Sequence, residues 1–192
     1  MDIIKKYNEA RPFISNGDLV LFHGKSLLSR TIQKLDNCYY NHIGVVIESN
    51  NRLFIIDSNE GGVEPDFLSD RIKEYKDFCI ITPLEWAPQQ IENALGQVID
   101  KSETHIKYDF FLLVKIAMYR KFGWKIKRHN ENRDICSEFA RRYLRYLEPE
   151  TTCFEQPNLP YIFITPFDFL LYKDSNYNIK FNECDMTLFR KK

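Results

Sequence analysis

The stretch RDICSEFARRYLRYL, residues 133–147, predicts a buried helix that begins within a residue or so of a cysteine. Its apolar residues recur at helical spacing, and Asp134 is of a type favoured as an N-cap. Cys136 then lies at the helix N-terminus, where unpaired amide groups and the positive end of the helix dipole favour a thiolate. Free cysteine is also among the most buried residue types, so a packing role is the ordinary alternative. Residues earlier in the sequence that could act with a cysteine nucleophile distinguish Cys136 from a cysteine with a packing role.

The composition is that of a globular chain without a strong electrostatic field. With 192 residues it can bury a sizeable core, and we expect a single domain over residues 1–192. Lys plus Arg equals Asp plus Glu at 27 each, so charge gives no indication of nucleic acid or an anionic membrane as a partner. Affinity for a partner must therefore come from a local site.

Cysteine usage and the N-terminal sequence indicate the compartment. The five cysteines are odd in number, widely spaced and contain no Cys-x-x-Cys pair. This pattern argues against a disulfide framework and a structural zinc site, and it fits a reducing environment. Charges stand where a signal peptide needs its apolar core, and no uncharged apolar run approaches the length of a membrane span. We expect a cytoplasmic protein.

The order of predicted elements indicates an α+β fold with a mostly antiparallel sheet. Strands are expected at 19–22, 41–48, 53–57, 78–81 and 178–181, with a further strand or extended segment at 161–166. Helices are expected within 1–16, at 26–35, at 67–75, from 88 to about 101, at 108–122 and as a short turn at 167–172. Strands thus cluster early and late with helices between them, as in α+β domains.

A cysteine nucleophile needs a general base, and the base needs an orienting group of its own. The chain offers four histidines. His42 begins the first strand of a predicted hairpin, whereas the other three lie in a turn or in polar loops, where a solvated histidine is the default. His42 is therefore the candidate base for Cys136.

The hairpin loop decides which residue can orient His42. If two or four residues close the loop, His42 stands opposite Asn59 and diagonal to Asp57, on one face of the sheet. A three-residue loop would reverse the parity and bring Ser58 or Glu60 to that face. The sequence favours Asp57 and leaves Glu60 as the alternative.

Several motifs occur in a fixed order along the chain: Gly17-Asp18-Leu19-Val20, the predicted helix at 26–35, Asn41-His42-Ile43-Gly44-Val45-Val46, Ile55-Ile56-Asp57-Ser58, Gly61-Gly62-Val63, Tyr108-Asp109 and Asp134-Ile135-Cys136-Ser137-Glu138. Together they resemble the YiiX/YebB-like cysteine hydrolases, part of the circularly permuted branch of the NlpC-type papain-like superfamily. The resemblance covers about residues 17–166, with the helical segment at about 88–122 inside it. It implies a permuted papain-like fold, in which the histidine precedes the cysteine.

The resemblance also implies roles for single residues. Cys136 would be the nucleophile and His42 the base. Asp57 stands where the family usually has an acidic residue, commonly Glu. Asn41 replaces a frequent Ser before the histidine, and together with Tyr40 and Ser137 it is a candidate for substrate binding or for the oxyanion site.

The activity implied by the resemblance is acyl transfer through an acyl-enzyme, without a metal or an organic cofactor. We expect an amidase or peptidase, whose substrate is a small peptide, an amino-acid amide or a lipid-like acyl compound. One alternative is a lipid acyl hydrolase or acyltransferase, with lipid contact from the apolar segment 108–122 and the basic loop after it. The other is a catalytically silent binding module. We expect neither nucleic-acid binding nor stable membrane insertion, and the sequence does not indicate an oligomeric state.

Overall fold

The computed structural model describes most of the first 102 residues, the Cys136 helix and short pieces of the remaining chain. The described residues are 2–36, 38–59, 62–83, 86–102, 107–108, 115–116, 118–119, 122–123, 133–147, 166 and 177–179. None of the described helices is both long and apolar enough to cross a membrane.

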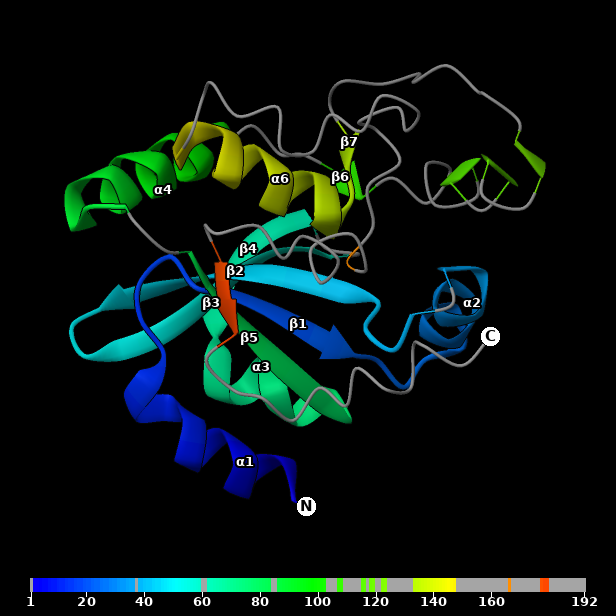
Figure 1. Ribbon diagram of the computed structural model, residues 1–192, viewed down its shortest axis with the longest axis horizontal. Coiled ribbons are helices and arrows are strands. Elements are labelled where there is room, and N and C mark those ends of the chain that lie inside the picture. The colour runs from blue at the N-terminus through cyan, green and yellow to red at the C-terminus, as the bar shows by residue number, and fades with distance from the viewer. Residues whose placement is uncertain are drawn as a thin grey trace.

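A six-stranded antiparallel sheet forms the centre of the described structure (Figure 1). Its strands stand in the order β4-β3-β2-β1-β5-β8. They are β1 (Leu19–His23), β2 (His42–Ser49), β3 (Arg52–Asn59), β4 (Gly62–Phe67), β5 (Asp77–Pro83) and β8 (Tyr177–Ile179). Every neighbouring pair is antiparallel, which confirms the predicted α+β class with a mostly antiparallel sheet.

Helices cover both faces of this sheet (Figure 1). One face carries α4 (Pro88–Ser102) and α6 (Cys136–Leu147), and the other carries α1 (Ile3–Ala10), the 3-10 turn η1 (Arg11–Phe13) and α3 (Leu68–Glu74). Side chains alternate across β2, so Ile43 and Val45 pack in the core under α6, whereas Val46 packs in the core with α1 and α3. The helix α2 (Leu27–Asp36) follows β1.

Two short contacts fix where α6 lies. The strand β7 (Arg133–Asp134) pairs in parallel with β6 (Lys107–Tyr108) and leads directly into the helix. Near the middle of α6, the Tyr143 hydroxyl donates a hydrogen bond of 3.0 Å to the carbonyl of Gly17, just before β1. Gly17 has a φ of +85°, a conformation that glycine adopts without strain.

The loop between β2 and β3 has an even number of residues, and this places Asp57 beside His42. Asn50 and Asn51 form the loop, with φ of 52° and 60°, as both central residues of a type I′ turn require. In the resulting register Gly44 stands opposite Asp57, so His42 lies diagonal to it on the same face. The predicted parity is confirmed.

Three local predictions were wrong. The strand β4 was missed, because Gly61-Gly62-Val63 was interpreted as a turn; β4 is an edge strand, where Pro65 is tolerated. Residues 107–108 form β6 at the position where a helix was expected to begin. The N-cap position of α6 belongs to Ile135, whose carbonyl accepts the Phe139 amide at 3.0 Å, while Asp134 lies in β7.

The remaining predicted elements agree to within a few residues, where the structure describes them. The expected helices at 26–35 and from 88 correspond to α2 and α4, and the expected strand at 178–181 corresponds to β8. Most of the helix expected at 108–122, and all but residue 166 of the segments expected at 161–166 and 167–172, lie outside the described residues.

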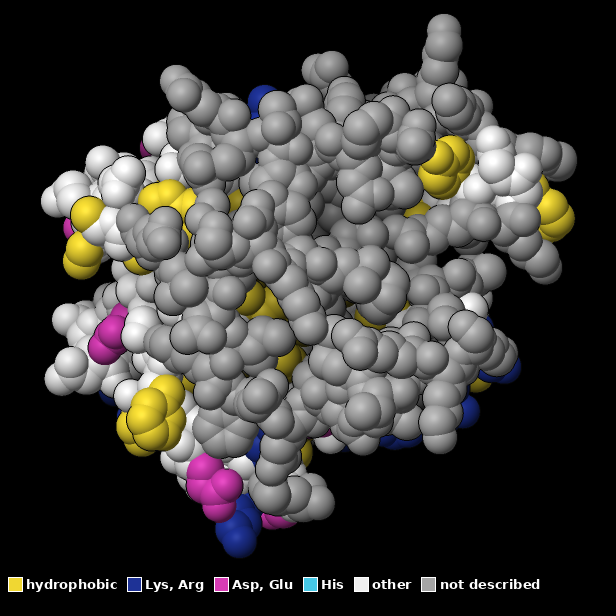
Figure 2. Space-filling model, viewed as in Figure 1, with side chains coloured by type: hydrophobic (Ala, Val, Ile, Leu, Met, Phe, Trp, Pro, Cys, Tyr) yellow, Lys and Arg dark blue, Asp and Glu magenta, His cyan; other side chains and the backbone are white. Residues whose placement is uncertain are grey.

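The surface shows both signs of charge. On the face seen in Figure 2, acidic and basic side chains lie together over α1.

Candidate active site

One end of the sheet gathers the polar residues that the sequence singled out. Antiparallel pairing places the end of β1 and the end of β3 beside the start of β2, with Phe22 opposite His42. The chain enters α6 from β7 at this same end (Figure 1). The turn after β1 is held here too, because the Asn41 side-chain oxygen accepts the Gly24 amide at 2.7 Å.

His42 and Asp57 form a buried hydrogen-bonded pair. The His42 Nε2 atom lies 2.7 Å from Asp57 Oδ2, Asp57 is fully buried and His42 is 8% exposed. A carboxylate only accepts hydrogen bonds, so Nε2 carries the hydrogen and Nδ1 is the ring nitrogen left for another partner. The contact predicted from the hairpin parity is confirmed, and the triad role of both residues stays a prediction. Glu60, the alternative partner, lies outside the described residues.

Arg71 of α3 holds the second oxygen of Asp57. Its Nη2 atom lies 3.2 Å from Asp57 Oδ1, which also accepts from the Asn59 amide at 3.3 Å. The same guanidinium donates to Asp66 and, at 3.1 Å, to Glu74. Both oxygens of the buried carboxylate are therefore bound, as a buried charge requires.

Tyr75 packs against the imidazole. The rings of Tyr75 and His42 are nearly parallel, at 9°, with centroids 5.8 Å apart. Phe22 packs against both rings, with its ring centroid 4.4 Å from that of Tyr75 and 5.9 Å from that of His42. The imidazole therefore has an aromatic wall as well as a carboxylate partner.

Sequence reasoning missed both Arg71 and Tyr75. They stand at i and i+4 at the end of α3, the spacing that places two side chains on one side of a helix. That spacing was the available sign, but a short helix rich in charged residues was interpreted only as a weak helix.

Cys136 is the first residue of α6, as predicted, and it is 3% exposed within the core under that helix. His42 has the parity of Val46 and contacts Phe22, so its side chain belongs to the opposite face, with α3. Any approach of the sulfur to the imidazole must therefore pass the end of β2. Cys136 is near enough that a thiolate there raises the pKa of His42.

The environment of His42 favours its charged form. Burial by itself lowers the pKa of the imidazole, but negative charge on Tyr75, Cys136 and Asp57, and the hydrogen bond to Asp57, raise it well above 6.5 overall. Burial also raises the pKa of the Tyr75 phenol, so Tyr75 is neutral near pH 7. At neutral pH the stabilising charge in direct contact with the imidazole is therefore that of Asp57.

The three further candidates are packed into the protein. Asn41 is 7% exposed, and its oxygen accepts from Gly24 and, at 2.9 Å, from Gln33. Tyr40 is 1% exposed and lies edge-on to Tyr39. Ser137 is fully buried in the first turn of α6. A role of these residues at a substrate stays a prediction, and their burial gives it no support.

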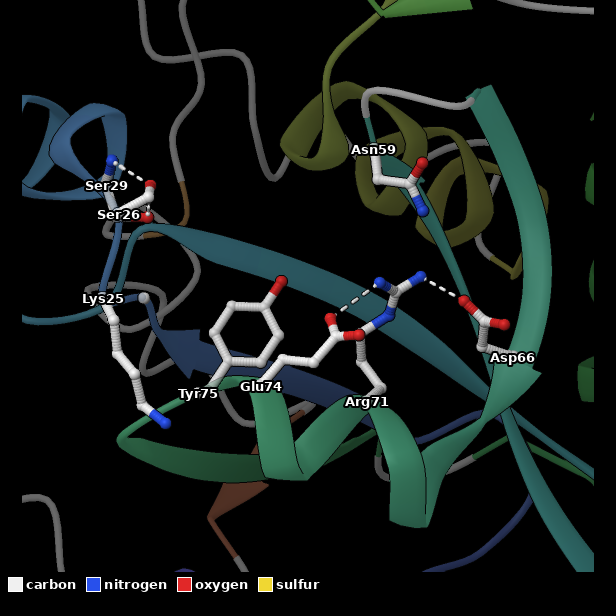
Figure 3. A pocket seen from close by; sticks show the side chains of 9 residues that line it. Lys25, Ser26, Ser29, Asn59, Asp66, Arg71, Glu74 and Tyr75 are labelled. Carbon is white, nitrogen blue, oxygen red and sulfur yellow. Dashed lines mark hydrogen bonds and ion pairs between the residues drawn. The ribbon is translucent and has the colours of Figure 1, made fainter.

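A polar pocket lies between α3 and the turn after β1 (Figure 3). Its volume is about 610 Å³, and it is lined by Gly24, Lys25, Ser26, Ser29, Asn59, Asp66, Arg71, Glu74 and Tyr75. Arg71 and Tyr75 connect it to the His42–Asp57 pair, because each contacts a member of the pair and lines the pocket. No aliphatic side chain belongs to this lining, so the pocket suits polar groups better than a hydrocarbon chain.

Comparison with known proteins gives a likeness of fold. No family model matches the chain, and no curated protein matches it. Among solved structures it is similar to the crystal structure of metalloprotein YiiX from Escherichia coli O157:H7, with a TM-score of 0.56 and 17% sequence identity. The match covers 70% of this chain and 67% of that one. The chain thus has a YiiX-like fold.

YiiX is named a metalloprotein, which raises the question of a metal site in this chain. Among the described residues, no group of three or more His, Cys, Asp or Glu side chains is placed to hold a metal ion. The nearest arrangement, His42 with Asp57, is a hydrogen-bonded pair whose carboxylate is already shared with Arg71. The described residues do not fit a metal centre here, and the chemistry proposed below uses none.

Proposed function

We propose that this protein is a papain-like cysteine hydrolase that cleaves an amide bond, with Cys136 as nucleophile, His42 as base and Asp57 as the orienting residue. The observation that carries the proposal is the buried hydrogen bond of 2.7 Å between His42 and Asp57, at the end of the sheet where Cys136 begins α6. The YiiX-like fold is consistent with it.

The proposed reaction runs through an acyl-enzyme. The Cys136 thiolate attacks the carbonyl carbon, and the backbone N–H of Cys136 at the start of α6 helps to hold the oxyanion. The His42 imidazolium gives its proton to the leaving amine. Neutral His42 then takes a proton from water, which attacks the acyl-enzyme and releases the acid and the thiolate.

The raised pKa of His42 suits this sequence of steps. Proton transfer to the leaving amine needs an imidazolium near neutral pH, and Asp57 stabilises that form without giving up its own charge. Because Nε2 is bound to Asp57, Nδ1 is the atom that exchanges the proton with Cys136 and the leaving group.

Selective alkylation of Cys136 by iodoacetamide tests the proposal before any substrate is known. Cys38, Cys79 and Cys136 are equally buried, at 4%, 2% and 3% exposed, so exposure alone cannot favour one of them. We expect Cys136 to react first near pH 7 and the preference to disappear in His42→Ala. Peptide mass spectrometry locates the label. If Cys136 reacts no faster than the other four cysteines, the binding-module alternative is favoured.

Substrate class is part of the proposal. A small peptide or amino-acid amide fits the polar pocket that Arg71 and Tyr75 line better than a lipid acyl group does, because that lining lacks aliphatic side chains. Sedimentation with lipid vesicles separates the two classes. If the protein sediments with them and hydrolyses an acyl ester but no amide, the lipid acyl hydrolase is the better assignment.

A further inference from the structure

The face of Tyr75 is turned to the candidate base and its hydroxyl to the pocket. Its ring lies parallel to that of His42, and Phe22 holds the Tyr75 ring from 4.4 Å away. Figure 3 shows the phenol pointing away from α3 into the space between Ser26 and Arg71. Tyr75 therefore contacts the imidazole and lines the pocket as well.

This placement has two physical consequences for His42. An aromatic face attracts a cation that lies within about 6 Å of its centroid, and the imidazole centroid is 5.8 Å away, so the ring favours imidazolium over neutral imidazole. A parallel neighbour also restricts rotation of the imidazole about its last side-chain bond. Asp57 fixes only Nε2, so a second contact is needed to fix the plane that aims Nδ1.

We propose that Tyr75 is a positioning residue of the candidate active site, whose ring holds the imidazole of His42 in the plane that presents Nδ1 to Cys136. The part that concerns Cys136 rests on the proposed function. The contact with His42 does not, so the two can be tested separately.

The charged groups around His42 belong to residues other than Tyr75. Asp57 lies on β3 and Cys136 at the start of α6, and Arg71 of α3 acts on His42 through its contact with Asp57. Since Tyr75 is neutral near pH 7, replacing it removes a ring face and a hydroxyl but no charge.

Three variants separate these contributions. Tyr75→Phe keeps the ring and removes the hydroxyl, whereas Tyr75→Leu removes both, with Tyr75→Met as a more flexible substitute if the leucine variant does not fold. Tyr39→Leu is the matched control, because Tyr39 packs on His23 at 4.1 Å near the same end of the sheet. The two readouts are the NMR titration of the His42 ring protons and the rate of Cys136 alkylation by iodoacetamide at pH 7.

We expect Tyr75→Leu, or Tyr75→Met, to lower the pKa of His42 by about half a unit or more, and to slow alkylation of Cys136 roughly threefold. Tyr75→Phe and Tyr39→Leu should leave both readouts near the wild-type values. The proposal is overturned if His42 titrates alike in wild type and Tyr75→Leu, or if Tyr39→Leu gives the same change. Should wild-type Cys136 show no selective alkylation, the proposed function fails, and the NMR titration still decides whether Tyr75 positions His42.

Discussion

Replacing Asp57 by Asn removes the charge that faces His42 and nearly keeps the side-chain volume. The asparagine oxygen can still accept a hydrogen bond from Nε2, so the imidazole keeps a neutral partner. Asp66→Asn is the matched control, because it removes the same charge from another partner of Arg71 without touching His42. The comparison isolates what the buried carboxylate does for the imidazole.

The size of the effect follows from the geometry of the pair. A hydrogen bond to a charged partner contributes about 1.5–3 kcal/mol, and one pKa unit corresponds to about 1.4 kcal/mol. Asp57 is fully buried and His42 nearly so, so solvent screens their 2.7 Å contact little. We expect the pKa of His42 to fall by about 1–2 units in Asp57→Asn, from well above 6.5 towards its ordinary range.

NMR titration of the His42 ring protons measures this shift directly, and activity gives a second readout. In the wild type the competent state is the thiolate–imidazolium pair, so the alkaline limb of the pH profile should move down with the pKa of His42. Asp57→Asn should retain more activity than His42→Ala, because Asp57 only orients and stabilises the imidazolium. The reasoning is refuted if Asp57→Asn shifts the His42 titration no further than Asp66→Asn does.

Other changes test the remaining parts of the site and fold. Cys136→Ala and His42→Ala should each abolish nearly all hydrolysis, and the double variant should lose little more, since the two act as a unit; additive losses in kcat would contradict this. The raised pKa of His42 stabilises the fold fully below pH 6.5 and progressively less as pH rises through the raised pKa, so urea melts from about pH 6 to 9 should show a decline that His42→Ala reduces. Arg71→Met should lower the free energy of unfolding in urea by about 3 kcal/mol, because the substitution breaks the buried ion pair with Asp57. It should also raise the pKa of His42 further, because the Asp57 charge then acts on His42 alone. A stable variant with an unchanged His42 titration would show that Arg71 does not tune the pair. Gly17→Ala should lower the free energy of unfolding by at least about 2 kcal/mol, because the new Cβ would lie 2.5 Å from Ile91 Cγ2 and from the Tyr143 hydroxyl at a positive φ; a wild-type melting curve would count against that packing.

Local pattern in the sequence was enough to predict several features of the fold and the candidate site. The period of apolar residues located α2 and α6, Pro88 located the start of α4, and the β-rich runs located the hairpin. A loop with an even number of residues then placed Asp57 beside His42. Side chains alternate strictly along a strand, so one pair of opposed residues fixes the register of the whole hairpin. The cysteine at the start of α6 followed in the same way from local spacing.

What surrounds those residues depends on how separate elements pack. Arg71 and Tyr75 belong to a short helix and its end, whose role depends on docking against the far face of the sheet, and no local pattern encodes that docking. The same holds for β4, because the edge position that tolerates Pro65 exists only once β3 is in place. The sequence joined Cys136 and His42 as partners, but only the fold shows that they come from opposite faces of one sheet. Strand parity sets the face within an element, and the packing of separate elements sets which residues meet.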